Sequence, residues 1–114
     1  MGMDANVICI GKFSHEIIDC LEYGPEFYKG VVPGTIIITH LFNCTTSDQS
    51  RWLAEALGGK AWDFNTHCIA NNKVDWVRLY EMMEGCIEWD GEAEIKKFAK
   101  LLKAEFMCIY QPNG

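Results

Sequence analysis

Residues 35–42, Thr-Ile-Ile-Ile-Thr-His-Leu-Phe, are the strongest strand signal in the chain and decide the predicted fold. Three consecutive isoleucines place apolar side chains on both faces of a strand, because successive side chains point to opposite faces. Burial of both faces is typical of a central strand in a parallel sheet that helices cover on either side. This stretch therefore predicts a buried parallel strand.

Apolar runs and helical patterns alternate along the rest of the chain. The runs at 5–13, 61–69 and 106–110 predict further strands, and 86–89 predicts a short one. Helical patterns separate these runs, with start signals at Ser14, Thr46, Asn72 and Asp90. Such alternation favours parallel strands with helices packed on them. The sequence therefore predicts a single α/β domain over residues 1–114. Its mainly parallel or mixed sheet of four to five strands alternates with four helices. A two-layer α+β sandwich is the alternative if 86–89 is not a strand.

Composition restricts the class of protein and of partner. The chain has 114 residues, 49% of them hydrophobic, which suits one domain with its own packed core. A net charge of −6 argues against nucleic acid and against anionic membranes as partners. No apolar run approaches the roughly 20 residues that cross a bilayer. The sequence predicts no nucleic-acid partner and no membrane partner.

Six cysteines are spread along the chain without any C-x-x-C pair, and most have apolar neighbours. The first residues show neither a basic segment nor a long apolar segment, so we expect no signal peptide. Cysteines in this context are expected to be reduced thiols, not a disulfide framework. These features predict a cytoplasmic location.

The segment from Cys44 to Arg51 is the first candidate for chemistry. A strand–loop–helix junction directs backbone N–H groups and the positive end of a helix dipole at one point, which suits an anion. Thr46, Ser47, Ser50 and Arg51 are the candidate anion ligands, and Cys44 is a weak catalytic candidate. Six residues separate Cys44 from Arg51, one more than in the C-x5-R loop of cysteine-dependent phosphatases. That extra residue turns the guanidinium about 100° around the helix, so an ordinary capped helix start is favoured.

Histidines form the second candidate group. His15, His40 and His67 lie near the carboxyl ends of three predicted strands, where ligands bind in open α/β sheets. In a parallel sheet, His40 and His67 would open onto one hollow and are weak catalytic candidates as general bases. Their spacing is not a metal signature, and neither a metal nor a cofactor is predicted.

Aromatic residues form the third group. Four tryptophans in so short a chain favour one exposed aromatic patch, with Trp62, Phe64 and Trp76 as candidate interface anchors. No phosphate-binding glycine loop and no nucleophile elbow occurs in the sequence.

The favoured hypothesis is a non-enzymatic protein-interaction module. Its acidic balance suits a protein partner with a basic surface, and a homo-oligomer is compatible with the composition. The alternative is a small enzyme or ligand-binding domain that holds an anionic group at the Cys44–Arg51 junction.

Overall fold

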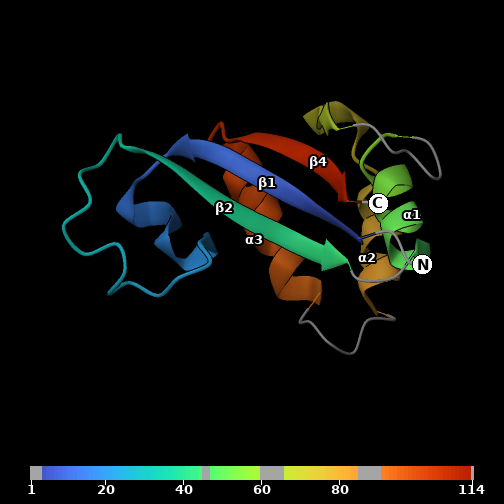
Figure 1. Cartoon of the computed structure of the whole chain (residues 1–114), viewed down its shortest axis with the longest axis horizontal. Helices are drawn as coiled ribbons and strands as arrows, with labels where there is room; N and C mark the ends of the chain where they lie inside the picture. The colour runs from blue at the N-terminus through green and yellow to red at the C-terminus, as the bar shows by residue number, and fades with distance from the viewer. Residues whose placement is uncertain (1–3, 45–46, 60–65, 85–90, 114) are drawn as a thin grey trace.

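The computed structural model describes residues 4–44, 47–59, 66–84 and 91–113 (Figure 1). Four strands, three α-helices and two 3₁₀-helices (η) lie in these segments. In chain order they are β1 (Asp4–Lys12), η1 (His15–Cys20), β2 (Ile36–Cys44), α1 (Ser47–Ala56), β3 (His67–Cys68), η2 (Asn71–Lys73), α2 (Trp76–Glu84), α3 (Gly91–Lys103) and β4 (Met107–Asn113).

The four strands form one sheet in the order β2-β1-β4-β3, and every neighbouring pair is antiparallel. The prediction of a mainly parallel or mixed sheet is therefore wrong. The described connection between β1 and β2 contains no helix long enough to serve as the expected crossover. A parallel crossover must return along the strand, and nine residues of strand span about 30 Å. The six residues of η1 rise only about 12 Å, because a 3₁₀-helix advances about 2 Å per residue.

The chain instead re-enters the sheet at the end from which it left. The Phe13 N–H donates to the Thr35 carbonyl oxygen at 2.8 Å, and the Gly34 N–H donates to the Phe13 carbonyl oxygen at 2.8 Å. These two hydrogen bonds extend the β1–β2 ladder beyond both strands. The intervening segment, including η1, forms a long excursion at that end of the sheet (Figure 1).

The helices pack against one face of the sheet. Figure 1 looks onto the opposite face, and α3 lies behind the ribbons of β1, β2 and β4. The inner face carries every second residue of the long strands, and seven of those described are buried. They are Ala5, Val7, Cys9, Thr39, Leu41, Cys108 and Tyr110. The described contacts between helices and sheet use this face: the Tyr110 hydroxyl, for example, donates to the Ser50 carbonyl oxygen of α1 at 3.4 Å.

A β-bulge in β2 turns one further side chain into the core. The register with β1 shifts between Ala5 and Val7, which leaves β2 with an extra residue there. Phe42 lies at this shift with φ +54°, a left-handed conformation that is unfavourable for a bulky residue. Its ring is buried edge-on against Phe98 of α3, with centroids 5.3 Å apart. The bulge therefore lets both Leu41 and Phe42 point into the core.

Close packing of β1 on the segment before β4 requires a glycine. A Cβ atom at Gly11 would lie 2.6 Å from atoms of the Phe106 ring. Phe106 is itself buried, so its ring fills the space that a side chain at position 11 would occupy.

Several predicted boundaries differ from the structure. Ser14 makes no side-chain capping hydrogen bond, and a short 3₁₀-helix follows it. The helix expected from Asn72 begins instead at Trp76, where the Asp75 carboxylate accepts the Arg78 N–H at 3.1 Å. The last strand continues through Pro112, which pairs with Ala5. Within the described segments, β3 pairs only with Ile109 and Tyr110 of β4, so no described strand needs a hydrogen bond from the missing proline N–H.

Two predicted strands are described in part or not at all. Of the run at 61–69, only His67–Cys68 is described as strand, and residues 61–65 lie outside the described segments. The short strand expected at 86–89 also lies outside them. Among the helices that the structure does describe, none is long and apolar enough to cross a bilayer.

Candidate functional site

The two histidines expected to share a hollow lie at opposite edges of the sheet. His40 belongs to β2 and His67 to β3, the two outer strands in the order β2-β1-β4-β3. Three strand spacings separate these edges, which is about 14 Å. The two strands also run antiparallel to each other, because each is antiparallel to its inner neighbour and β1 is antiparallel to β4. The structure therefore brings no histidine pair together at one strand end.

Each histidine has its own local partners. His40 Nδ1 contacts the Glu22 carboxylate, and the Glu22 backbone N–H donates to the buried Thr39 hydroxyl at 3.1 Å. This pair fixes the chain after η1 against the edge of β2. His67 lies on the inner side of the sheet, and its ring contacts the Tyr110 ring with centroids 5.3 Å apart. Both contacts hold parts of the fold together.

The predicted anion site at residues 44–51 is described only in part. Thr46 and the side chains of Cys44 and Ser47 lie outside the described part of the structure. Ser50 is fully buried in α1 and so does not face solvent. The Arg51 guanidinium lies 5.6 Å from the centre of the Trp52 ring, a cation–π contact on the outside of α1.

The predicted aromatic patch is likewise only partly visible. Trp62 and Phe64 lie outside the described residues. Trp76 is half-buried, and its ring lies 5.6 Å from that of Phe98, so it contributes to the core. Within the described segments no three His, Cys, Asp or Glu side chains gather into a group that could hold a metal ion.

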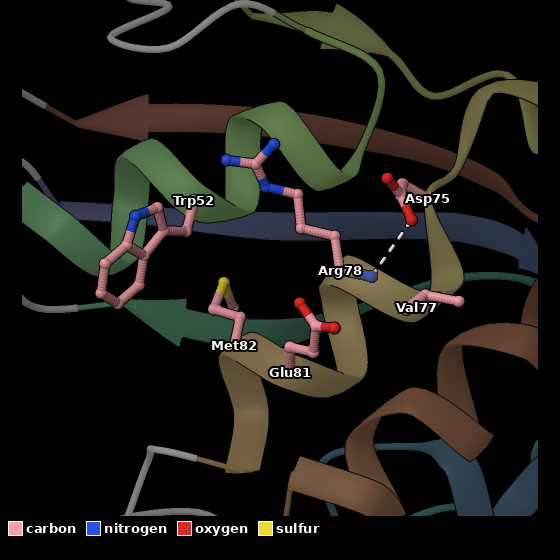
Figure 2. A pocket seen from close by; sticks show the side chains of 6 residues that line it. All are labelled: Trp52, Asp75, Val77, Arg78, Glu81 and Met82. Carbon is pink, nitrogen blue, oxygen red and sulfur yellow. Dashed lines mark hydrogen bonds between the residues drawn. The ribbon is translucent and has the colours of Figure 1, made fainter.

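A shallow hollow of about 480 Å³ lies between α1 and α2. Figure 2 shows the Trp52 indole and the Arg78 side chain above Met82 and Glu81, with Asp75 and Val77 at one end. The Arg78 guanidinium forms an ion pair with Glu55 of α1, so its charge is already neutralised within the fold. The hollow thus combines an aromatic ring, two acidic groups and one internally paired cation.

The outer face of the sheet carries a group of exposed apolar side chains, among them Ile36, Ile38 and Met107. Its side chains come from alternate positions on all four strands, opposite to the buried set. We call this surface the open sheet face and define it as Ile8, Ile10, Lys12, Ile36, Ile38, His40, Cys68, Met107 and Ile109.

The strand register arranges the open sheet face in two adjacent apolar rows. The first, which we call the Ile8 row, runs across the sheet as His40, Ile8, Ile109 and Cys68. The second, the Ile10 row, runs as Ile38, Ile10 and Met107. Ile38 is 57% exposed and Met107 is 49% exposed, and Ile36 beside them is 61% exposed. The face therefore presents exposed apolar side chains on β2 and β4, on either side of the half-buried Ile8 and Ile10 of β1.

Our sequence reasoning missed this surface, although its signal was present. In three runs, the side chains on both faces of the strand are apolar: Val7-Ile8-Cys9-Ile10, Ile36-Ile37-Ile38 and Met107-Cys108-Ile109. We interpreted that pattern as burial under helices on both faces. The described helices cover the inner face alone, and Ile36, Ile38 and Met107 on the outer face are exposed. A comparison of the chain with protein-family models, with curated proteins and with solved structures found no match.

Proposed function

We propose that this chain is a protein-interaction domain and that the open sheet face is its working surface. One observation carries the proposal: the Ile10 row places the exposed Ile38 and Met107 on either side of the half-buried Ile10, and the half-buried Ile8 and Ile109 lie beside them on the same face. Antiparallel sheets with one exposed face normally alternate apolar inward and polar outward. An exposed apolar patch on a small soluble domain marks a surface that another molecule covers.

The charges on this face favour a protein over a nucleic acid or an anionic membrane. Lys12 and, when protonated, His40 are its only basic side chains among the residues described, and His40 contacts Glu22. Phosphate-rich partners need a basic stripe, which two such side chains do not supply. The chain as a whole carries −6. The partner is therefore a protein that brings a flat apolar surface of its own, such as a second sheet, since sheets pack face to face about 10 Å apart.

The alternative, an anionic group held at the Cys44–Arg51 junction, has less support. Ser50 is buried, Arg51 already contacts Trp52, and His40 and His67 lie at opposite sheet edges. A basic partner, expected from the net charge, fits the hollow with Glu81 and Asp75 better than the open sheet face. We rank the open sheet face first, because its exposed apolar side chains have no described cover.

Site-specific photo-crosslinking tests the proposal. A photoreactive amino acid replaces Ile38 on the open sheet face in one protein, and Val77 on α2, also well exposed, in a matched control. Irradiation in an extract of the source cells is expected to give a discrete protein adduct at position 38, and Met107→Glu in the same protein is expected to remove it. No protein adduct at position 38, or an adduct at position 77 alone, would contradict the proposal.

A further inference from the structure

We infer that the partner on the open sheet face is a second copy of this chain, an inference that rests on the proposed function. The Ile8 row and the Ile10 row are neighbours on the sheet. A two-fold axis that runs between them across the strands lays each row of one copy over the other row of its partner. Ile8 then faces Ile10 of the partner subunit, and Met107 faces Ile109 of the partner subunit. His40, at the β2 end of the Ile8 row, faces Ile38 of the partner subunit. The apolar centre of the surface is thus complementary to itself, as an isologous dimer requires.

Charge selects this antiparallel stacking over the parallel one. In a parallel stack the two Lys12 side chains would lie over each other, about 10 Å apart, at the spacing of stacked sheets. In the antiparallel stack they lie at opposite ends of the interface. Each is about three residues from the axis, so the two are about 20 Å apart, well beyond the Debye length of about 8 Å at physiological salt.

Most of the described acidic side chains lie away from the two apolar rows. Asp4 shares the outer alternation of β1 but stands two rows beyond the Ile8 row, and Glu22 reaches His40 at the β2 edge. The other described acidic side chains lie on the helices and on their connections, for example Glu16, Asp19, Glu81 and Glu92. Two stacked sheets hold the helical layers of the two copies more than about 10 Å apart, so salt screens most of the repulsion between them.

The size of the apolar centre sets the strength of the expected dimer. Three strands and the positions from Ile8 to Ile10 cover roughly 14 Å by 10 Å. That apolar centre is smaller than a standard interface, which buries about 800 Å² of accessible surface on each partner. The dimer is therefore expected to be reversible, with a fraction that rises with protein concentration.

A charge-swap experiment tests the second copy and its orientation together. Met107→Glu and Ile109→Lys are made in separate proteins, and mass in solution is followed by sedimentation velocity over a hundredfold range of concentration. Wild type is expected to approach twice the monomer mass of 13.0 kDa. Each variant alone is expected to stay monomeric, because a charge then faces an apolar side chain of the partner. Loss of one central contact weakens association by about 30-fold or more.

Mixing the variants supplies the decisive comparison. Met107→Glu with Ile109→Lys is expected to restore a dimer, because the two opposite charges face each other across the antiparallel stack. Met107→Lys with Ile109→Lys is the matched control and is expected to stay monomeric. Circular dichroism confirms that every variant is folded. The inference would be overturned if the mixture of Met107→Glu with Ile109→Lys remained monomeric, or if a dimer formed despite each of the three substitutions.

The two proposals fail in different ways. A wild-type chain that is monomeric at every concentration overturns the second copy. An adduct of position 38 with a different protein would then leave the proposed function standing, whereas no adduct with any protein would remove both. Binding of the monomer to neutral lipid vesicles, lost in Ile38→Asp, would assign the face to a lipid surface and would also overturn both.

Discussion

Ile10 and Ile38 lie opposite each other across the β1–β2 ladder, with both side chains on the outer face of the sheet. Ile38 is more than half exposed, although its partner Ile10 belongs to β1, a strand whose inner-face side chains Ala5, Val7 and Cys9 are buried. An aliphatic pair at this place stabilises the sheet locally, but it also leaves apolar area in water that only association can remove. This pair connects the fold to the proposed function.

Replacement of Ile38 by Asp is expected to cost little stability, because the side chain faces solvent. The free energy of unfolding should fall by no more than about 1 kcal/mol, the span of strand propensity. Leu41→Asp is the matched change on the inner face, where Leu41 is 3% exposed. It buries an unpaired carboxylate and is expected to cost about 3–5 kcal/mol or to prevent folding. Urea unfolding of dilute protein measures both, and equal losses would show that the two faces are wrongly assigned.

Gly11→Ala is expected to destabilise the domain by about 1–3 kcal/mol, because the new methyl group overlaps the Phe106 ring. Gly24→Ala is the control: nothing lies within 4 Å of a Cβ atom there, so the change is expected to be neutral or slightly stabilising.

Combination of Gly11→Ala with Phe106→Leu identifies the cause of that loss. If the ring is responsible, the smaller Leu side chain makes room for the methyl group, and the double variant is more stable than the sum of the single losses predicts. Strict additivity in urea unfolding would show that the two residues do not touch.

Glu94 gives a prediction about pH. Burial raises the pKa of this carboxyl above its ordinary value of 4.5, although its Oε2 accepts the Phe42 N–H at 3.4 Å, which lowers the pKa in part. A carboxyl with a raised pKa in the folded state favours folding fully below its unfolded pKa, and that contribution is lost as pH rises through the folded value. The stability of Glu94→Gln relative to wild type is therefore expected to increase as pH rises above 4.5.

Urea unfolding at a series of pH values measures this difference. Glu92→Gln removes the same charge from an exposed site on the same helix, and so separates burial from the change in net charge. A Glu94→Gln variant whose advantage shrinks with rising pH would refute the raised pKa.

Thiol reactivity should divide the cysteines whose side chains are described. Cys68 is exposed, whereas Cys9, Cys20 and Cys108 are buried. A hydrogen bond with Cys108, whose Sγ lies 3.3 Å away, and burial both raise the pKa of Cys9, and burial raises that of Cys20. Iodoacetamide reacts with thiolates, so Cys68 is expected to react first.

Mass spectrometry of an alkylation time course on the monomeric Ile38→Asp variant provides the check. The buried thiols are expected to react only when urea unfolds the chain. Modification of Cys9 in folded protein at the rate of Cys68 would contradict the packing of β1 against β4.

Local features of the fold could be predicted from the sequence, but the sheet order could not. The cores of β1, β2 and β4 and the helix around Ile95 and Phe98 all follow from local periodicity. The arrangement of β2 beside β1 depends on hydrogen bonds between Phe13 and residues 34–35, a non-local pairing that no local pattern encodes.

The apolar run at Ile36–Ile38 was misread for a physical reason. Its composition shows that side chains on both faces of β2 are apolar, but it does not show whether a helix covers each face. We expected a helix of the same chain to cover the second face of β2, but no described helix lies on that face. The bulge at Phe42 is a further feature without a sequence signal, because the φ of +54° suits glycine or asparagine, not phenylalanine.

Carbene footprinting of the purified chain tests most directly whether the open sheet face is covered in solution. Wild type and Ile38→Asp are labelled at the same high concentration, and Val77 on α2 serves as an internal reference because it is 69% exposed. We predict that Met107 and Ile36 are protected in wild type and labelled in Ile38→Asp, while Val77 is labelled equally in both. Equal labelling of Met107 and Ile36 in the two proteins would contradict the account.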